Sequence, residues 1–471
     1  MSKKKKKSNI ITITAKDCLA FRVDEKVLDI NHKHVLSEFA HHFSKNSVFN
    51  FSTNDKQDKI SFKDEPFASL DYIKNEWVAG RWVGSANVKQ NNTEYIVEVM
   101  PRFTNLVLLK MIERIFSINI LNSFNKDEID NNNISSILEK LLPYIWTNKL
   151  GTANKYGVPR HSQNIYHKGA TIKGKLDVRK SIIPLFRQKE VVSVSKEKLV
   201  NETIAQIILQ AKQLLERKLD KNFYKKNDSA YNAILNFETA GFQQYRITEY
   251  EYQKIQYKSI YQSYKDIVDF SWQILKHKNL NQDSDNENKG FSLFVDMAEI
   301  WELYLSSLLK THFSEWHVES PKINIYSAKS YSRLIIPDIV MSKGNNIVIF
   351  DAKWKTMKYM YNDYDRTDFF QIHTYISYYQ NIDKKNIAIA GLVYPLSEKY
   401  KNEISDGLFG HINNSIKFAI EGIDLNEIKS TKPIDDNIRL FEKSEKEFID
   451  RIYNLLEQNA HGANRVDGPT G

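Results

Sequence analysis

The sequence contains one cysteine, Cys18, among its 471 residues. A lone cysteine excludes an internal disulfide and any zinc site built from several cysteines. No stretch reaches the roughly 18 uninterrupted apolar residues that a membrane-spanning helix needs. The lysine run at residues 3–7 is not followed by an apolar stretch, so it does not form a secretory signal. These absences favour a cytoplasmic protein with no membrane partner.

A complete phosphate-binding P-loop is also missing. Residues 169–176 (GATIKGKL) nearly match the pattern, but Leu176 stands where a Ser or Thr must hold magnesium. The strand and long helix that normally flank such a loop are not predicted around it. We therefore expect the chain to bind no nucleotide itself, so that any nucleotide-driven motor must be another chain.

The overall charge permits nucleic-acid binding without proving it. The net charge is +9, and the five lysines at residues 3–7 supply more than half of it. Such a tail either contacts phosphates non-specifically or keeps the chain soluble. Hydrophobic residues make up 41% of the chain and aromatic residues 12%, and this length predicts two to four domains.

The strongest chemical signal lies in residues 333–355. This stretch holds two runs rich in Ile and Val, at 334–341 and 347–350, which are typical of β-strands. Gly344 and Asn345 between them fit a two-residue type II′ turn, because glycine supplies the positive φ that this turn needs. A hairpin centred on this turn has one register.

That register places Asp351 opposite Asp338 on one face of the hairpin, with Cβ atoms roughly 5 Å apart. Lys353 lies two residues beyond Asp351 and therefore points to the same face. Two carboxylates and an ammonium on an otherwise apolar hairpin are costly unless they bind something. A divalent metal ion with an ordered water fits such a set. The alternative is an exposed hairpin end with a chance salt bridge.

Four pieces of sequence, in order, carry a resemblance to a known family. A predicted helix over residues 291–313 holds Glu302, and it is followed by PD at 337–338 and DAK at 351–353. The segment DFFQIHTY at 368–375 then supplies an aspartate, a glutamine and a tyrosine. PD followed by DAK resembles the PD-(D/E)xK nuclease signature. The whole set resembles McrC, the nuclease subunit of the McrBC modification-dependent restriction systems.

The resemblance implies an endonuclease that hydrolyses DNA phosphodiester bonds with Mg²⁺ or Mn²⁺. Lys353 would orient the attacking water and offset the charge that develops on the phosphate. The implied residues are Asp338, Asp351, Lys353 and Glu302 for catalysis, Asp338, Asp351, Glu302 and the backbone carbonyl of Ala352 for the metal, and Gln371 and Tyr375 for positioning DNA. Residues 353–364 also interleave lysines with aromatic residues, which would either grip a DNA strand or form an ordinary surface loop.

The amino-terminal half carries a weaker resemblance to the same family. Residues 78–103 form two β-like runs around the turn QNNT and end in Pro101 and Arg102, as McrC proteins do. In that family this half of the chain docks on a hexameric AAA+ GTPase, McrB, and stimulates its GTPase. The resemblance therefore implies a McrB-like hexamer that recognises double-stranded DNA, often at methylcytosine, in the cytoplasm of a bacterium or archaeon. The alternative is a plain hairpin that supports a helix at 106–121.

The predicted fold is a multidomain α+β and α/β chain whose nuclease domain has a mixed central sheet flanked by helices, like a restriction endonuclease. The predicted parts are a disordered basic tail (1–9), a β-containing partner-docking domain (10–135), a helical middle region (136–280), a linker (281–290), the PD-(D/E)xK nuclease domain (291–400), and a C-terminal helical extension with a mobile tail (401–471). Apolar periodicity predicts strands at 10–21 and 387–393, helices at 134–146, 197–219, 257–278 and 438–457, and a loop at 151–174.

Three other functions fit the same residues. The first is a related restriction subunit that acts with a companion methyltransferase and a partner reading an unmodified sequence. The second is a nuclease that cuts DNA without GTP or partner. The third is a non-catalytic, DNA-binding activator whose acidic residues are structural, although the spacing of the site residues argues against it.

Overall fold

The computed structural model describes residues 10–43, 48–49, 51, 66–90, 93–124, 129, 134–217, 223–282, 293–325, 334–355, 366–396, 403–406 and 416–463. Within these residues the chain forms two compact units. One unit is drawn from both ends of the chain, before residue 139 and after residue 287, and the other from residues 139–287. The predicted basic tail and most of the predicted linker lie outside the described residues. No helix in the described ranges has the length and apolar character needed to cross a membrane.

The first unit contains a five-stranded sheet near the N-terminus, in the strand order β1-β6-β5-β10-β2. Its elements are β1 (Ile10–Lys16), β2 (Val48–Phe49), β5 (Trp82–Gln90), β6 (Thr93–Met100) and β10 (Leu293–Asp296), with α1 (Ile30–His42), α2 (Asn105–Phe116) and the small hairpin β3 (Ala68–Asp71) and β4 (Glu76–Ala79). The predicted hairpin at 78–103 is confirmed, since β5 and β6 pair antiparallel up to Gln90 and Thr93. Alternate residues of β6 are buried in the core, as period-two patterning requires.

The helix predicted over residues 291–313 is wrong at its start. Leu293–Asp296 is strand β10, which pairs antiparallel with β5 of the N-terminal sheet. Helix α10 then runs over Met297–His312. The helix begins there because the Asp296 side chain accepts a hydrogen bond from the Ala298 N–H, which is a capping contact.

The second sheet of this unit has six strands in the order β11-β14-β15-β16-β18-β17. Its elements are β11 (His317–Glu319), β14 (Ile339–Lys343), β15 (Asn346–Ala352), β16 (Asn386–Leu396), β17 (Glu403–Asp406), β18 (Lys417–Asp424), α11 (Arg366–Ser377), the π-helical turn Tyr378–Ile382 and α12 (Ile434–Ala463), with a short pair β12 (Ile323–Asn324) and β13 (Leu334–Ile335) beside them. Strands β15, β16 and β18 run parallel, and the outer pairs are antiparallel, so the sheet is mixed as predicted.

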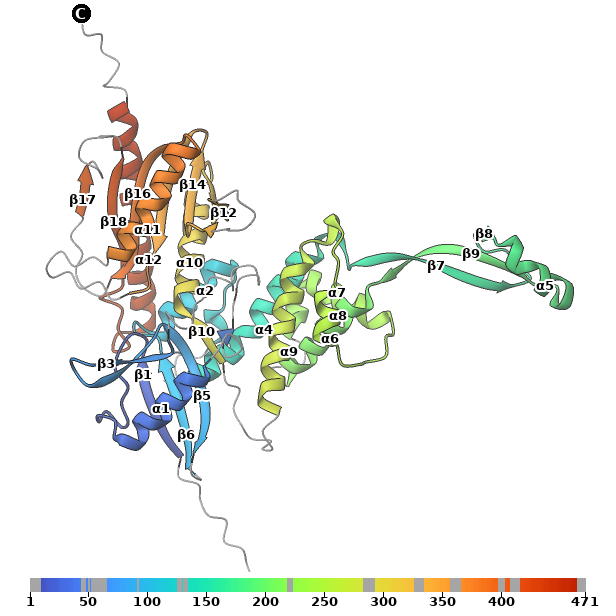
Figure 1. The fold of residues 1–471 in the computed structure, drawn as a ribbon, viewed down its shortest axis with the longest axis horizontal. Helices are drawn as coiled ribbons and strands as arrows, with labels where there is room; N and C mark the ends of the chain where they lie inside the picture. The colour runs from blue at the N-terminus through green and yellow to red at the C-terminus, as the bar shows by residue number, and fades with distance from the viewer. Residues whose placement is uncertain are drawn as a thin grey trace, which may run out of the picture. The chain divides into compact units, whose positions relative to one another are not determined.

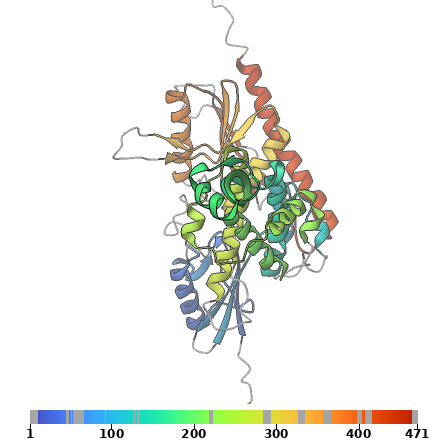
Figure 2. The same cartoon turned by 90° about the vertical axis from the view of Figure 1, so that its right-hand side faces the viewer.

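Helices cover both faces of this mixed sheet. Helix α11 packs on one face, and α10 and α12 lie on the other (Figures 1 and 2). The predicted nuclease boundary at residue 400 is therefore too early, because β18 is a central strand of the sheet and α12 covers it. Parallel pairing with β16 explains the miss, since a lone apolar strand gives no local sign of its partner.

The second unit is a helical body with a β-ribbon. Its elements are α4 (Ile134–Ala153, which begins in the first unit), α6 (Glu202–Glu216), α7 (Asp228–Thr239), α8 (Glu249–Gln253), α9 (Tyr264–Gln282), α5 (Val178–Gln188), β7 (Arg160–Gly169), β8 (Lys175–Leu176) and β9 (Val191–Val200). The predicted helical middle region thus also contains a β-ribbon, and the prediction of a loop at 151–174 is wrong because β7 covers Arg160–Gly169. The helix predicted at 197–219 begins at residue 202, because Asn201 caps it through a hydrogen bond from the Ile204 N–H.

Strands β7 and β9 form a long antiparallel ribbon, paired from Arg160 with Val200 to Gly169 with Val191. Ten residues of strand span about 33 Å. Figure 1 shows the ribbon reaching away from the helices of its own unit, with β8 and α5 at its far end. We call residues 160–200 the arm.

Candidate active site

The hairpin of β14 and β15 has the register predicted from sequence. Ile339 pairs with Phe350, and Lys343 pairs with Asn346 across a two-residue turn. Gly344 has φ of 62°, which supplies the positive φ that the turn needs. Continuing this register by one residue brings Asp338 opposite Asp351, near the carboxyl end of a central strand.

Asp351 and Lys353 lie on the face of the sheet that α11 covers. The Asp351 side chain has no exposed surface, and Lys353 Nζ lies 2.5 Å from its Oδ2 atom. The same ammonium lies 3.4 Å from Asp368 Oδ1 and donates to Gln371 Oε1 at 2.9 Å. One lysine therefore links the strand to the following helix.

Asp338 completes the pair of carboxylates. Its Oδ2 atom accepts a hydrogen bond from the Ala352 N–H at 2.9 Å, which fixes it across the hairpin end. Burial raises the pKa of Asp351, and the negative charge of Asp368 raises it further. The Lys353 ammonium and a hydrogen-bonding contact with Asp338 lower it, but the net pKa is still raised. A carboxyl group with a raised pKa beside other carboxyl groups is a place where a cation is favoured.

Lys353 stays protonated in this setting. Burial alone would lower its pKa, but the charges of Asp351, Asp368 and Asp338 outweigh burial and raise the pKa. The site therefore holds a charged ammonium whose side chain is 13% exposed. Such a group can stabilise negative charge that develops on a bound phosphate.

Helix α11 supplies the two residues predicted to position DNA. Gln371 Nε2 donates to the Tyr375 hydroxyl at 2.8 Å, and that hydroxyl donates to the Ile336 carbonyl oxygen at 3.2 Å. The two side chains share a helix face because they are four residues apart. Gln371 also accepts from Lys353, so the helix is fixed to the strand through it.

Asp368 belongs to the candidate site, although no role was assigned to it from sequence. Its carboxylate is nearly buried and pairs with Lys353 and also with Lys355, whose Nζ lies 3.1 Å from both oxygens. Its spacing of three residues before Gln371 puts it on the same helix face, and this was the available signal. Residues 356–365, where part of the predicted DNA-gripping segment falls, lie outside the described residues.

Glu302 approaches the site from α10. Burial raises the pKa of Tyr375, and the charges of Asp351, Asp338 and Glu302 raise it further. All three carboxylates therefore act on one hydroxyl. The neighbouring Glu299, one turn earlier, instead accepts a hydrogen bond from the Phe51 N–H at 3.2 Å.

The donor set fits magnesium. Within the described residues no three His, Cys, Asp or Glu side chains are grouped so that they could hold a metal ion. The candidate site offers two carboxylate side chains, those of Asp338 and Asp351, together with the main-chain carbonyl of Ala352. Mg²⁺ is commonly bound in this way, through one or two carboxylates with several waters retained.

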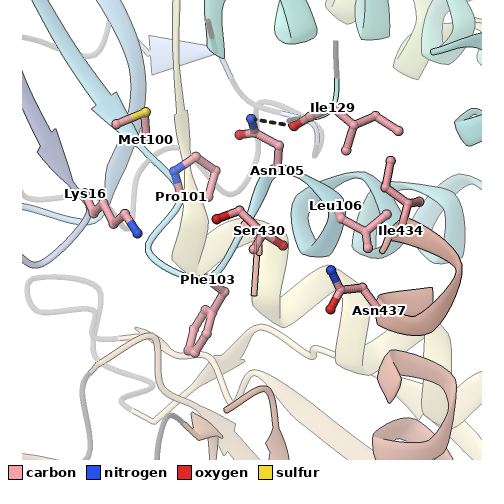
Figure 3. A pocket seen from close by; sticks show the side chains of 11 residues that line it. Lys16, Met100, Pro101, Phe103, Asn105, Leu106, Ile129, Ser430, Ile434 and Asn437 are labelled. Atoms are coloured by element: carbon pink, nitrogen blue, oxygen red, sulfur yellow. Dashed lines mark hydrogen bonds between the residues drawn. The ribbon is translucent and has the colours of Figure 1, made fainter. Parts of the chain in front are cut away.

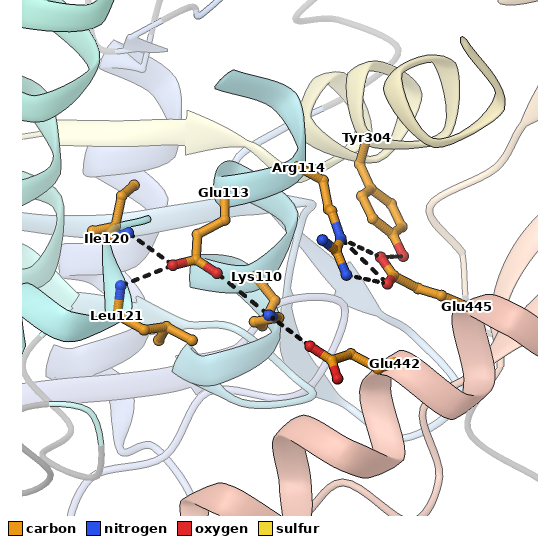
Figure 4. Close-up of polar contacts among 8 residues, drawn as sticks. All are labelled: Lys110, Glu113, Arg114, Ile120, Leu121, Tyr304, Glu442 and Glu445. Atoms are coloured by element: carbon orange, nitrogen blue, oxygen red, sulfur yellow. Dashed lines mark hydrogen bonds and ion pairs between the residues drawn. The ribbon is translucent and has the colours of Figure 1, made fainter. Parts of the chain in front are cut away.

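Helix α10 is anchored from two sides. Arg114 of α2 and the Tyr304 hydroxyl of α10 both donate to Glu445 of α12, with Arg114 Nη2 2.8 Å from one oxygen (Figure 4). Lys110 and Glu113 continue this network along α2. The helix that carries Glu302 is thereby tied to α12 and, through Glu445, to α2.

A pocket lies elsewhere in the first unit, where β6 ends and α2 begins (Figure 3). Its lining includes Met100, Pro101, Ser430 and Asn437. None of the carboxylates or the lysine of the hairpin lines it. It is therefore separate from the candidate active site.

The fold and site define a protein with a mixed α/β sheet and a carboxylate–lysine–glutamine cluster at the carboxyl end of a central strand. Residues 78–395 match the family model described as McrBC 5-methylcytosine restriction system component. The chain belongs to this family. No match was found among curated proteins.

Two solved structures are similar to the chain. One is a refined half-complex from a tetradecameric assembly of Thermococcus gammatolerans McrB AAA+ hexamers with bound McrC. It is 16% identical with a TM-score of 0.47, over 94% of this chain and 100% of that chain. The other is the cryo-EM structure of the Thermococcus gammatolerans McrBC complex, 15% identical with a TM-score of 0.35, over 65% of this chain and 89% of that chain.

Proposed function

We propose that this chain is the McrC-like DNA endonuclease subunit of a GTP-dependent restriction complex that defends a cell against phage. The observation that carries the proposal is the contact of Lys353 with Asp351, Asp368 and Gln371 beside Asp338. Membership in the McrBC family supports it. The domain that holds this site would be restriction-endonuclease-like.

The residues divide the chemistry among them. Asp338 and Asp351, with the backbone carbonyl of Ala352, would hold Mg²⁺ directly, and Glu302 would reach it through a retained water. When bound, the ion supplies a Lewis acid and an activated water. Lys353 would orient that water and stabilise the charge that develops on the phosphate. Gln371 and Tyr375 would then have two roles: Gln371 holds the Lys353 ammonium in place, and both limit where a DNA strand can lie.

The arm is the element we propose for contact with a McrB-like AAA+ GTPase hexamer. It carries ten Lys and Arg against three Asp and Glu, a net charge of +7. Its tip also exposes a group of large apolar side chains: Ile172, Val178, Ile182, Ile183, Leu185 and Phe186. Such a patch is unusual on a free surface and indicates a protein partner. This proposal moves the main contact from residues 10–135, where the sequence placed it, to the middle region.

Cleavage can be tested with the complex reconstituted from this chain and a McrB-like AAA+ GTPase. Plasmid DNA, methylated or unmodified, is incubated with GTP and Mg²⁺, and the wild type is compared with Asp351→Asn. We expect Mg²⁺-dependent cuts by the wild type and none by the variant. Equal cutting by both would remove the site from the mechanism. Cutting of unmodified DNA alone would favour the system with a companion methyltransferase.

The arm has its own test. Phe186→Ser combined with Ile183→Ser should abolish stimulation of the partner's GTPase, because it removes the most exposed apolar surface at the tip. The control is Ile73→Ser, which changes an even more exposed apolar residue in the turn between β3 and β4. If the arm variant stimulates GTP hydrolysis like the control, the contact lies elsewhere.

A further inference from the structure

Asp17 and Arg102 leave the N-terminal sheet side by side. Strands β1 and β6 are parallel, and their last paired residues are Lys16 and Met100. The segments that follow the two strands therefore leave the sheet next to each other, at its carboxyl end. The Asp17 carboxylate has no exposed surface, and its Oδ1 atom accepts a hydrogen bond from the Arg102 N–H at 2.5 Å. Burial raises the pKa of Asp17, and the Arg102 charge opposes this.

The second oxygen of Asp17 reaches the other sheet. Trp354 Nε1 donates to Asp17 Oδ2 at 2.6 Å, across 337 residues of sequence. The Arg102 guanidinium lies over the Trp354 ring, 4.6 Å from its centroid, and donates to the Lys355 carbonyl oxygen at 3.3 Å. A carboxylate and a guanidinium at the end of the N-terminal sheet thus hold an indole at the end of the mixed sheet, by a hydrogen bond and a cation–π contact.

Trp354 directly follows Lys353. The Lys353 N–H donates to the Val393 carbonyl oxygen at 2.9 Å, and the Trp301 indole donates to the same oxygen at 3.1 Å. The backbone at residue 353 is therefore fixed on one side by β16 and on the other by the contacts of Trp354. The hydrogen bond from the Lys353 N–H continues the ladder of β15 by one residue. Successive residues of an extended chain point to opposite faces, so holding the Trp354 side chain on one face sets the direction of Lys353 on the other.

We propose that Asp17 and Arg102 are positioning residues that act on Lys353 through Trp354. The N-terminal sheet is then part of the nuclease site, because it places the ammonium between Asp351 and Gln371. The proposal rests on the proposed nuclease function. It also gives Arg102, which the sequence marked only as part of a family pattern, a physical task.

The test compares Asp17→Asn with a matched control, Glu421→Gln. Both changes turn a fully buried, arginine-paired carboxylate of the first unit into an amide. Glu421 differs in its place: it lies in β18 and pairs with Arg451 of α12. In Asp17→Asn one of the two acceptor oxygens becomes an NH2 group, so either the Arg102 N–H or the Trp354 N–H loses its acceptor and faces a donor instead. The reconstituted complex is assayed for cleavage rate against DNA concentration, for GTP hydrolysis and for thermal stability.

We expect Asp17→Asn to lower kcat for cleavage by roughly tenfold to a hundredfold, the usual effect of a small misplacement of a catalytic group. KM for DNA and stimulated GTP hydrolysis should stay within about twofold of wild type, since neither depends on where one ammonium points. Glu421→Gln should lose stability but keep kcat. A purely structural role for Asp17 would instead make the two variants behave alike.

A second variant, Arg102→Lys, keeps the charge and the backbone N–H but removes the planar group over Trp354. It should show the same loss in kcat and covers the case in which Asp17→Asn does not fold. The positioning role would be overturned if Asp17→Asn and Arg102→Lys both kept the wild-type kcat. It would also be overturned if Glu421→Gln lost as much kcat as Asp17→Asn while being equally stable. Absence of Mg²⁺-dependent cleavage by the wild-type complex would instead overturn the nuclease proposal itself, so the two failures are distinguishable.

Discussion

Replacing Lys353 by alanine tests the proposed chemistry and the electrostatics of the site together. The change removes an ammonium that lies 2.5 Å from Asp351 Oδ2 and 3.4 Å from Asp368 Oδ1. It leaves the backbone hydrogen bond from residue 353 to Val393 in place. Lys353→Met is a useful companion, because it keeps the apolar stem and removes only the charge.

Two magnitudes follow from this geometry. Removing one group that stabilises transition-state charge typically costs about 3–4 kcal/mol, so cleavage should fall by roughly a hundredfold to a thousandfold. Breaking a buried ion pair by deleting one partner costs about 3–5 kcal/mol of stability when the other charge stays ionised. Asp351 can avoid part of this second cost by taking up a proton, since its pKa is already raised.

The pH dependence has a definite sign. Lys353 is the strongest influence that lowers the pKa of Asp351, so its removal raises that pKa further above the ordinary value of 3.8. A carboxyl group with a raised pKa stabilises the folded state at low pH and loses this contribution as pH rises through the folded-state pKa. The stability that Lys353→Ala loses relative to wild type should therefore be small in acid. It should grow as pH rises from the folded-state pKa of Asp351 in the wild type to the higher folded-state pKa of Asp351 in the variant.

Cleavage, GTP hydrolysis and unfolding are measured in parallel on wild type, Lys353→Ala and Lys353→Met. GTP stimulation should be unchanged, because the proposed contact with the partner is in the arm. Adding Mg²⁺ should raise the unfolding temperature of the variants more than that of wild type, since the cation replaces the lost positive charge beside Asp351. Full cleavage by either variant would remove Lys353 from the mechanism. A stability deficit that grows on acidification would refute the account of Asp351.

Three further predictions concern other parts of the chain. The isolated protein should bind GTP and ATP no more tightly than millimolar, because the Asp177 carboxylate caps α5 where a phosphate would have to lie; micromolar binding of a fluorescent nucleotide would contradict this. Gly391→Ala should destabilise the first unit by about 1–3 kcal/mol, measured by denaturant unfolding, because a Cβ there would collide with the Ala419 carbonyl oxygen of the neighbouring strand. Arg114→Ala should cost about 2 kcal/mol by leaving the buried Glu445 with fewer donors, and an unfolding midpoint equal to wild type would show that this network is dispensable.

The register of the β14–β15 hairpin could be predicted because its determinants are local. A two-residue turn with a glycine at positive φ sets the register, and the two-residue period of a strand then sets which side chains share a face. Both facts concern fewer than about 20 consecutive residues, the range over which sequence patterns are informative. The placement of Asp338 opposite Asp351, and of Lys353 on the same face, follows from that register. The hydrogen bond from the Ala352 N–H to the Asp338 side chain is a detail that only the structure gives.

Elements whose partners are distant in sequence were predicted less well. The residues of β10 were predicted to be the first turn of an apolar helix. The strands that pair with β10, β5 and β2, lie more than 200 residues earlier, so the local sequence gives no sign of the pairing. The arm was read as loop and helix because most of β7 is exposed, so it lacks the alternation of apolar residues that marks a half-buried strand. Each miss is a case in which tertiary contacts decided between two locally acceptable structures.

The same division between local and distant contacts governs how the site is built. The hairpin alone brings the carboxylates and the lysine to one face, but it cannot bury them. Burial comes from α11, which supplies Asp368 and Gln371, and from β16 and β18, which lie beyond the hairpin in the parallel part of the sheet. Burial is also what raises the pKa of Asp351. The sequence motifs, α11 included, therefore supply the charged and polar groups. The burial that sets their electrostatic properties comes in part from β16 and β18, which carry no motif.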